Sequence, residues 1–268
     1  AWHANKFFNP KTSGAVLPIV HVNGYKISNP TIYGIMSDAE LKSLFTGYGY
    51  HPFIVEGPNV QKNMMEAMEK SYQMIKEVKL RAKRGDMMRP KWPVIILRTL
   101  KGWSGVKSFD GHPVEGSSYS HGIPLENPRK DAKQLEAVEK WLNSYEINEL
   151  IDAKGRPKKE VLEFVPSGKL RMGMNKHAIG GNLVKNLKLP KSEKYEIKFK
   201  KPGEVCAGSM GVGANFLRDI FKLNKNNFRI MCPDEMESNK LHAVFEATKR
   251  AYMWPTKKTD ENISTDGR

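Results

Sequence analysis

The hydrophobic pattern of this chain predicts a set of parallel strands. Val16–Val22 and Pro93–Arg98 carry nearly continuous apolar side chains, as do strands that are buried on both faces of a parallel sheet. Phe53–Val55 is a shorter run of the same kind. The stretch from about Val60 to Arg84 is expected to be one long helix between two of these strands. Because βαβ order is typical of a doubly wound parallel sheet, we expect an α/β fold.

The long predicted helix carries one apolar stripe. Its members recur at spacings of three and four residues and are Met64, Met68, Tyr72, Ile75 and Val78. Such a stripe packs against the core of an α/β protein. The helix also holds a group of methionines, Met64, Met65, Met68 and Met74. We interpret them as flexible core filler rather than as a surface that binds a partner.

Capping residues and apolar spacing predict further elements. Ser37–Asp38 is expected to cap a short helix. Another helix is expected over about residues 130–150, and a third after Ser209–Ala214. Phe228–Cys232 is a predicted strand. Ser238–Asn239 is expected to cap a last helix. Asp234 is also interpreted as a capping residue. Alternatively, Asp234, Ser238 and Asn239 lie near a bound phosphate or at a subunit contact.

The composition is strongly basic. The chain has 44 Lys and Arg against 29 Asp and Glu, which gives a net charge of +15. A basic surface can bind nucleic acid, but these cations are dispersed in short runs such as Lys79–Arg84 and Lys198–Lys201. We interpret them as the solvated surface of an enzyme with anionic substrates, and we expect no nucleic-acid partner.

Cysteine content and hydropathy bear on the compartment. Cys206 and Cys232 have no metal-ligand spacing, which favours a reducing compartment over a disulfide framework. No apolar run approaches the length of a membrane span. We therefore expect a cytoplasmic protein without a membrane partner.

Both long apolar runs stop at a polar residue and a glycine. The first ends at Asn23–Gly24, and the second is followed by Thr99 and then Lys101–Gly102. In open α/β sheets, ligands bind beyond the carboxyl ends of the strands. An amide oxygen there can ligate Mg²⁺, and a glycine allows a diphosphate to approach the backbone. Taken alone, Asn23–Gly24 also fits an ordinary tight turn.

These turns belong to longer motifs. WHANKFFNPKTSGAVLPIVHVNGYKISNPT spans residues 2–31, LRTLKGW spans 97–103, SHGIPL spans 120–125 and PDE spans 233–235. In this order the motifs resemble phosphoketolases over nearly the whole chain. The resemblance implies thiamine diphosphate and Mg²⁺ as cofactors. It also implies cleavage of xylulose 5-phosphate or fructose 6-phosphate with inorganic phosphate, which yields acetyl phosphate and an aldose phosphate.

The resemblance assigns roles to six residues. Asn23 and the carbonyl of Tyr25 would ligate Mg²⁺, with Gly24 beside the diphosphate. Ile27 would pack against thiamine diphosphate. Lys101 and His121 would lie near the cofactor and the reacting end of the substrate, as a cation and a proton carrier. His21 is interpreted as a hydrogen-bonded core residue.

The resemblance also implies an internal piece of a longer enzyme. Residues 1–151 would belong to the diphosphate-binding domain, residues 152–203 to a linker rich in Lys, Pro and Gly, and residues 204–268 to the start of a second, pyrimidine-binding α/β domain. A Gly-Asp-Gly-Glu metal signature and an activating glutamate would lie outside the piece. We therefore expect a truncated sheet and little activity from the piece alone, and an oligomer, at least a dimer, for the complete enzyme.

Two other functions fit the sequence less well. Gly211–Gly213 superficially resembles a dinucleotide-binding turn, but no acidic residue follows at the end of a second strand. The segment around it, residues 204–216, departs from the family pattern, so its role stays open. The alternative to an enzyme is a non-catalytic basic module, descended from one, that binds polyanions through its charge.

Overall fold

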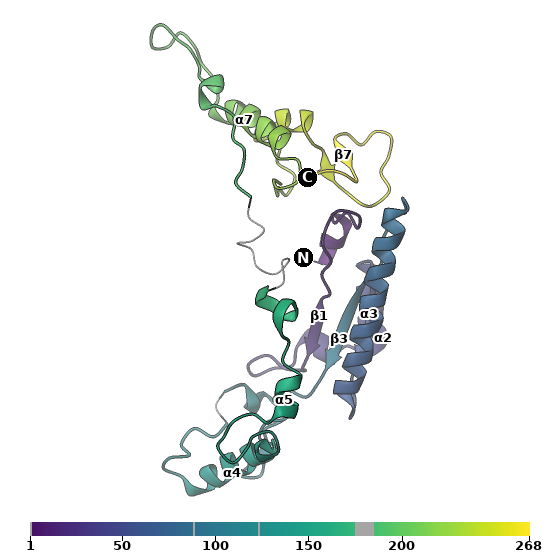
Figure 1. Cartoon of the computed structure of the whole chain (residues 1–268), viewed down its shortest axis with the longest axis vertical. Helices are drawn as coiled ribbons and strands as arrows, with labels where there is room; N and C mark the ends of the chain where they lie inside the picture. The colour runs from purple at the N-terminus through teal and green to yellow at the C-terminus, as the bar shows by residue number, and fades with distance from the viewer. Residues whose placement is uncertain (1, 88, 123, 175–184) are drawn as a thin grey trace. The chain divides into compact units, whose positions relative to one another are not determined.

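The computed structural model describes residues 2–87, 89–122, 124–174 and 185–268 (Figure 1). The chain divides into two compact units. The first, which we call the sheet unit, comprises residues 15–80 and 91–171. The second, the terminal unit, comprises residues 1–14, 81–90 and 172–268. The division after residue 171 falls within the predicted linker, and two short segments from the first part of the chain join the terminal unit.

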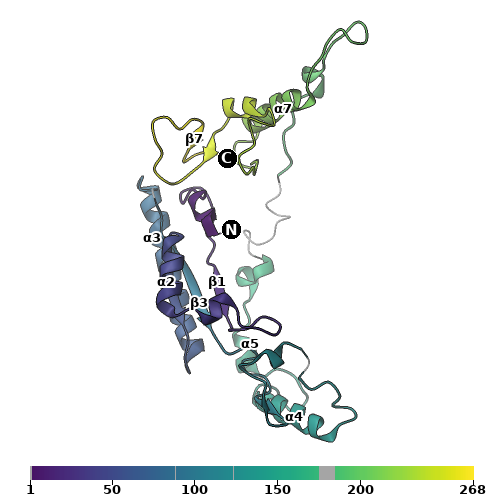
Figure 2. The same cartoon turned by 180° about the vertical axis from the view of Figure 1, so that it is seen from behind.

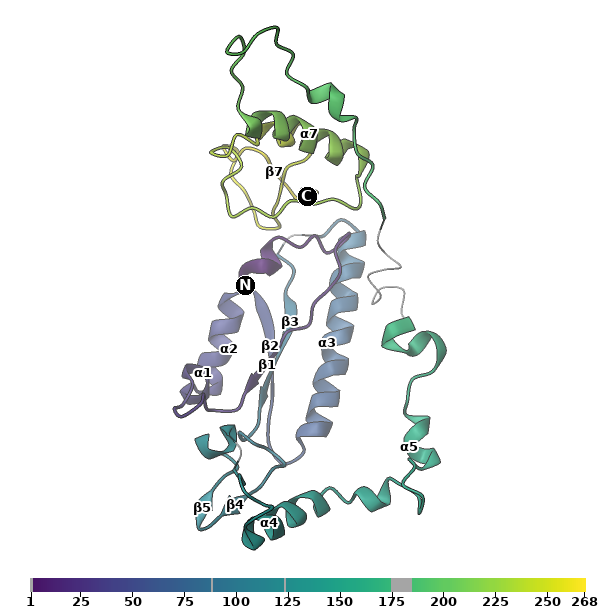
Figure 3. The ribbon, with the colours of Figure 1, turned by 90° about the vertical axis from the view of Figure 1, so that its left-hand side faces the viewer.

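The sheet unit is built on three parallel strands, which confirms the predicted parallel sheet and the α/β class. They are β1 (Ile19–Val22), β2 (Tyr50–Val55) and β3 (Trp92–Arg98), in the order β1-β3-β2. Helices α2 (Asp38–Gly47) and α3 (Val60–Lys83) lie on opposite sides of the strands (Figure 3). Helix α3 is nearer the viewer in Figure 1, and α2 is nearer in Figure 2. Because β2 and β3 are parallel neighbours and α3 joins them in the chain, β2-α3-β3 is the βαβ unit.

The core of this unit is centred on the middle strand. Val94, Ile95 and Ile96 of β3 are fully buried, because a helix covers each face. Ile95 packs with Val55 of β2 and with the α3 side chains Val60 and Ala67. Burial of these apolar groups is the main source of stability here, at about 1.5–3 kcal/mol for each large side chain.

The first predicted strand is shorter and more exposed than its sequence indicates. It begins at Ile19, and only Val22 of its four residues is buried. The expectation of burial on both faces is wrong for this run, since Val16 and Ile19 are 67% and 47% exposed. The reason is its place at the edge of the described sheet, away from the helix-covered centre that β3 occupies.

Helix α3 has the predicted length, but its buried face only partly coincides with the predicted stripe: Met64 packs against the core, and Ile75 and Val78 are half-buried. Ala67 and Ser71 are buried, whereas Met68 and Tyr72 of the predicted stripe are 43% and 57% exposed. Met65 is 73% exposed, so the core-filler interpretation is wrong for Met65 and Met68. The α3 side chains that pack with Val55 and Ile95 of the sheet are Val60, Met64 and Ala67, whereas Met68 and Tyr72 are on the more exposed side of the helix.

The remaining elements of the sheet unit are short. They are α1 (Ile32–Ile35), the antiparallel pair β4 (Ser108–Phe109) and β5 (His112–Pro113), α4 (Ala132–Asn143) and α5 (Lys159–Glu163). Helix α4 ends earlier than predicted, at Asn143, and a 3-10 turn follows at Ile147–Glu149. It packs through Val138 and Trp141 on a small cluster that contains Val106 and Val114.

The terminal unit contains α7 (Ser209–Leu223) and the two-stranded parallel pair β6 (Arg250–Ala251) and β7 (Ile263–Ser264). Its core joins Phe221 of α7 to Met236 and Val244. Further 3-10 helices in the chain are Trp2–Lys6, Ser118–His121, Gly168–Leu170, Met172–Met174, Ser192–Tyr195 and His242–Glu246.

Two predictions for the terminal unit are wrong. Phe228–Cys232 forms no strand, because the run has no neighbouring strand to pair with among the described residues. Ser238 and Asn239 do not cap the helix that follows. Their side chains donate to the carbonyl of Glu235 at 3.2 and 2.9 Å instead, and the 3-10 helix starts later, at His242.

The length and hydropathy of the helices bear on whether any of them could span a membrane. None of the helices in the described ranges is long and apolar enough to cross a bilayer.

Candidate functional site

The carboxyl ends of the three parallel strands surround a pocket of about 490 Å³. The residues directly after the strands are Asn23, Glu56 and Thr99, and all three line it. The complete lining is Val22, Asn23, Gly24, Tyr25, Glu56, Gly57, Val60, Arg98, Thr99, Leu100, Trp103 and Gly116. The volume is in the range of small-molecule and cofactor sites, and its position is where open α/β sheets bind ligands.

The turn after β1 is held by its own hydrogen bonds. Oδ1 of Asn23 accepts from the backbone N–H of Tyr25 at 3.2 Å. The carbonyl of Gly24 accepts from the N–H of Thr31 at 2.9 Å, so the loop closes on itself. Gly24 has φ +91°, a left-handed conformation that suits glycine. The amide oxygen of Asn23 therefore has a fixed place at the pocket, with a second lone pair still available.

Two parts of the pocket lining were missed from the sequence. Glu56 and Gly57 follow β2, and the parallel pairing predicted for Phe53–Val55 was the signal for them. The other is Arg98, the last residue of β3. Its Nε donates to Oδ1 of Asp38 at 2.8 Å, and its Nη2 donates to the carbonyl of Met36 at 2.6 Å. The sequence shows only that an arginine ends the strand.

Lys101 and His121 are brought together, although 20 residues separate them. Lys101 is only 7% exposed; its ammonium donates to the carbonyl of Lys26 and lies 3.3 Å from Nδ1 of His121. An ammonium has donors and no acceptor, so Nδ1 of a neutral His121 accepts and its proton is on Nε2. This contact fixes the tautomer and leaves Nε2 as the group that can give a proton.

The loop that carries Lys101 and the loop that carries His121 approach each other closely at Gly102. Gly102 has φ +69°, and a Cβ added there would lie 2.6 Å from Cβ of Ser120. The N–H of Gly116 also donates to the carbonyl of Lys101 at 2.7 Å. Lys101 and the His121 loop therefore have little freedom to separate.

The structure does not place all predicted residues in one cavity. Asn23, Gly24 and Tyr25 line the pocket, whereas Ile27, Lys101 and His121 are outside its lining. The side chain of Ile27 is 69% exposed. The Lys101–His121 pair is connected to the pocket through the loop after β1, because Lys101 donates to the carbonyl of Lys26 in that loop.

His21 differs from its interpretation as a core residue. It is exposed, because it lies on the edge strand β1. Its Nε2 is 2.7 Å from the hydroxyl oxygen of Thr99, the residue that follows β3. The contact ties the ends of two neighbouring strands at the rim of the site.

The chemistry of the pocket suits a cation shared with an anion. Within the described ranges, no group of three His, Cys, Asp or Glu side chains is close enough to hold a metal. The pocket offers neutral oxygens from the Asn23 side chain, the Tyr25 backbone and the Thr99 hydroxyl, and one carboxylate, that of Glu56. The first turn of α3, at Val60, borders the same pocket. Free N–H groups of a helix start favour phosphate, so these residues fit a divalent cation with a diphosphate.

A parallel sheet with such a pocket at its carboxyl edge defines an α/β protein whose candidate ligand site lies beyond the strand ends. Comparison with known families is more specific. Residues 1–183 match the XFP N-terminal domain, and residues 212–268 match D-xylulose 5-phosphate/D-fructose 6-phosphate phosphoketolase. The chain belongs to the phosphoketolase family.

Curated relatives agree over the full chain. It is 46% identical over 274 residues to a probable phosphoketolase of Chlorobaculum tepidum, covering 100% of this chain and 35% of the relative. It is 43% identical over 275 residues to one of Bradyrhizobium diazoefficiens, covering 100% and 34%. A probable phosphoketolase of Rhodopirellula baltica is 43% identical over 274 residues, with 100% and 35% covered. The chain thus spans about a third of the length of these relatives, as expected for an internal piece.

Proposed function

We propose that the complete protein is a thiamine-diphosphate- and Mg²⁺-dependent phosphoketolase. Its reaction would cleave xylulose 5-phosphate or fructose 6-phosphate with inorganic phosphate, giving acetyl phosphate and an aldose phosphate. The observation that carries this proposal is the pocket at the carboxyl edge of the sheet, with the Asn23–Tyr25 turn in its lining. Membership of the phosphoketolase family supports the reaction class.

The residues of the turn would hold the cofactors. Mg²⁺ takes about six oxygen ligands and keeps phosphate oxygens or waters among them. Asn23 and the Tyr25 carbonyl would supply two ligands, and Gly24 would let the diphosphate approach. Ile27 would add an apolar contact. When bound, thiamine diphosphate supplies the carbanion-stabilising chemistry of carbon-carbon cleavage.

Lys101 and His121 would act on the substrate. The Lys101 ammonium is buried next to a carbonyl and an imidazole, so its charge is poorly screened by water. It would attract the negative charge that develops on a reacting oxygen. The same ammonium holds His121 by Nδ1, so Nε2 would be the ring nitrogen that hydrogen-bonds a reacting hydroxyl, while the Lys101 ammonium supplies a proton to Nδ1 as one leaves Nε2.

The direct test is product formation by the full-length native protein. It should be incubated with each sugar phosphate, inorganic phosphate, thiamine diphosphate and Mg²⁺, and acetyl phosphate should be measured. We expect acetyl phosphate only when all four are present. Formation of a two-carbon transfer product on an added aldose acceptor, without acetyl phosphate, would instead indicate a transketolase-like reaction and overturn the proposal.

The metal role of Asn23 can be tested separately. Asn23→Ala removes one oxygen ligand, so we expect thiamine-diphosphate affinity at limiting Mg²⁺ to fall by about tenfold, or about 1.4 kcal/mol. The measurement is a calorimetric titration. Asn29→Ala is the matched control, because Asn29 is on the same loop and its side-chain amide donates only to Ser28. Equal affinities of the two variants would contradict the assignment of Asn23.

A further inference from the structure

We propose that Gly34 and Arg98 are positioning residues that fix the Asn23–Tyr25 turn for its metal and diphosphate. The inference rests on the proposed function of that turn. Gly34 is outside the pocket lining; Arg98 is part of the lining, but its guanidinium is bound to the Met36 carbonyl and to Asp38. Both act through the turn, by contacts that the sequence pattern does not reveal.

Gly34 lies directly against the turn. A Cβ added to Gly34 would be 2.7 Å from both Cα and O of Gly24, and 2.8 Å from Oγ1 of Thr31. Two of these atoms are backbone, so they cannot rotate away. Gly34 is not among the glycines with positive φ. Glycine is therefore required here by contact and not by backbone conformation, and an alanine must displace Gly24.

Helix α1 and the turn form one hydrogen-bonded piece. The Thr31 hydroxyl accepts from the N–H of Gly34 at 3.0 Å, and the Thr31 N–H donates to the carbonyl of Gly24 at 2.9 Å. Tyr33 places its ring edge-on to the fully buried Phe45 of α2, with centroids 6.0 Å apart. The piece is thus anchored to α2, and the position of α1 decides the position of Gly24.

Arg98 fixes the other end of α1. Met36 is the C-cap of α1, and Asp38 is the first residue of α2. The Arg98 guanidinium donates to both, and its side chain is only 20% exposed. Because Arg98 also pairs with Val22 in the β1-β3 register, one planar fork connects the α1–α2 junction to the strand end that precedes Asn23.

Small shifts of this assembly have a specific consequence for Mg²⁺. Its coordination is close to ideally octahedral, with oxygens at about 2.0–2.1 Å. A displacement of Gly24 by a few tenths of an ångström moves both proposed ligands, Asn23 and Tyr25, out of this geometry. Affinity for the cofactor pair should fall at low Mg²⁺ and return at high Mg²⁺, because the metal site is weakened and not removed.

The test uses the full-length protein with two pairs of variants. Gly34→Ala is matched by Gly47→Ala, a glycine of α2 with nothing within 4 Å of an added Cβ. Arg98→Gln is matched by Arg156→Gln, which removes the exposed ion pair to Asp152. Thiamine-diphosphate affinity is measured by calorimetry across Mg²⁺ concentrations. Hydrogen exchange of the Tyr25 and Thr31 amides is measured without ligand.

We expect Gly34→Ala and Arg98→Gln to weaken affinity at least tenfold at limiting Mg²⁺ and less than threefold in excess Mg²⁺. Both should speed exchange at Tyr25 and Thr31, and the control variants should change neither quantity by more than twofold. If Gly34→Ala fails to fold in thermal unfolding, Arg98→Gln carries the test, since it leaves the backbone contact intact.

The failure of this inference and the failure of the proposed function are distinguishable. Unchanged exchange at the two amides would overturn the positioning role of Gly34 and Arg98, whatever the affinity. Faster exchange with unchanged affinity would show that the turn has moved without effect on the cofactor. That result would overturn the cofactor role of the turn, and with it the proposed function of the site.

Discussion

At the scale of single residues, Lys101 has the most unusual surroundings. Lysine is rarely buried without a partner, yet Lys101 is 7% exposed and contacts one carbonyl and one imidazole nitrogen. Neither of these two partners is a carboxylate, and no ion pair of Lys101 occurs within the described residues. A lysine in such surroundings is the kind of cation that our proposed function requires at the reacting end of the substrate.

His121 is expected to affect turnover more than binding. In His121→Ala the proton on Nε2 is lost, while the Asn23 turn and the pocket lining stay in place. We expect kcat to fall about 100-fold or more, as for loss of a general acid or base, with the affinity for thiamine diphosphate changed less than threefold.

Steady-state kinetics and a calorimetric titration of the full-length protein check this prediction. His112→Ala is the control, an exposed histidine that contacts the ring of Tyr119. A kcat for His121→Ala within a factor of two of that control would show that His121 carries no proton in the rate-limiting step.

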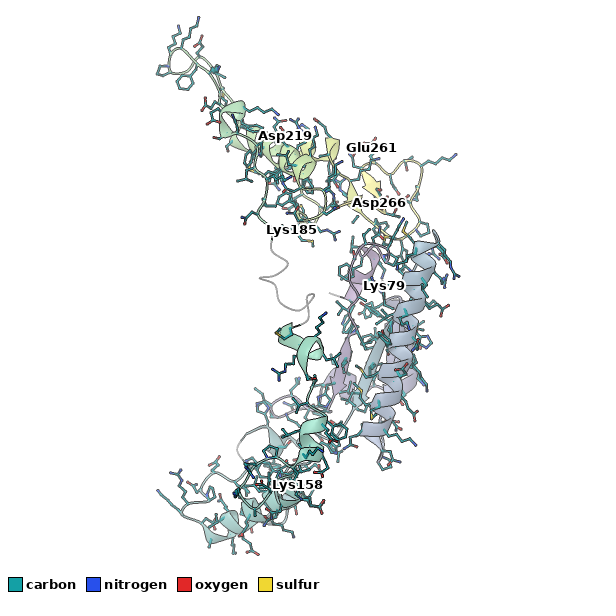
Figure 4. All side chains as sticks on the ribbon, in the orientation of Figure 1. Lys79, Lys158, Lys185, Asp219, Glu261 and Asp266 are labelled. Carbon is teal, nitrogen blue, oxygen red and sulfur yellow. The ribbon has the colours of Figure 1, made fainter. Side chains whose placement is uncertain are left out.

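Asp219 on α7 is the central charged residue of the terminal unit (Figure 4). It accepts from Arg218 at 2.9 Å, and from Lys194 and Tyr195 at 2.6 Å each. The Arg218 hydrogen bond is the largest cause that holds the pKa of this carboxyl far below its usual value, followed by Lys194 and Tyr195. Burial and the contact with Asp219 raise the pKa of Tyr195 to about 12.

The lowered pKa of Asp219 predicts acid sensitivity. Since the folded pKa is depressed, the stabilisation is complete above the unfolded value of about 4 and is lost as pH falls below it. Asp219→Asn should reduce the free energy of unfolding by about 2 kcal/mol at pH 7, and the difference from the native protein should shrink towards pH 3. Urea denaturation at the two pH values measures this. A difference that is equal at both would contradict the ionic role.

At the scale of elements, α2 shows local sequence control most clearly. The hydroxyl of Ser37 accepts from the N–H of Glu40 at 3.3 Å, and the Glu40 carboxylate accepts from the N–H of Ser37 at 2.7 Å. This capping box confirms Ser37 as the predicted cap. Hydrogen bonds from the Ser37 backbone and hydroxyl lower the pKa of Glu40.

The cap should be measurable as stability. Ser37→Ala leaves an N–H at the start of α2 without its side-chain partner, so we expect the free energy of unfolding to fall by about 1 kcal/mol. Ser43→Ala is the matched control, because Ser43 is exposed in the middle of the same helix, where alanine is favourable. Urea midpoints compare the two variants. Equal midpoints would exclude a contribution of the capping box.

Helix α3 shows that a local pattern predicts a helix without determining which of its faces is buried. The spacing of Met64, Met68 and Tyr72 predicts a helix and gives its length. It does not select the face, since Ala67 and Ser71 on the adjacent stripe are buried while Met68 and Tyr72 are exposed. The choice between two neighbouring stripes depends on the shape of the opposing surface, which is a property of the assembled unit.

At the scale of the whole molecule, the basic charge is spread over separate segments. Lys79 belongs to α3, Lys158 precedes α5, and Lys185 lies in the segment that leads towards α7 (Figure 4). Several cations are also paired, such as Arg98 with Asp38 and Lys107 with Glu115. The cations are therefore not gathered in one segment of the chain.

We therefore expect that this chain does not bind polyanions, as the alternative of a basic binding module would require. At physiological salt, a gel-shift titration of this chain with double-stranded DNA, single-stranded RNA or heparin should show no complex at micromolar protein. A complex that weakens steeply with salt would reverse this conclusion, because release of counterions from a neutralised polyanion is the signature of such binding.

What the sequence determined by itself is local. Apolar runs predicted the parallel strands, Ser37 predicted the start of α2, and Asn23–Gly24 at a strand end predicted the turn that lines the pocket. Each of these depends on neighbours within about one helical turn or one strand, where backbone propensity and side-chain spacing act directly.

The tertiary structure decided what depends on distant partners. It placed β3 between β1 and β2 and exposed the edge strand. It brought Lys101 to His121 across 20 residues and Arg98 to Asp38 across 60. Within the described ranges, it left Phe228–Cys232 without a strand partner. The physical reason is that strand pairing and burial depend on which surfaces come into contact when the chain folds. The spacing of residues along the sequence does not determine those long-range contacts.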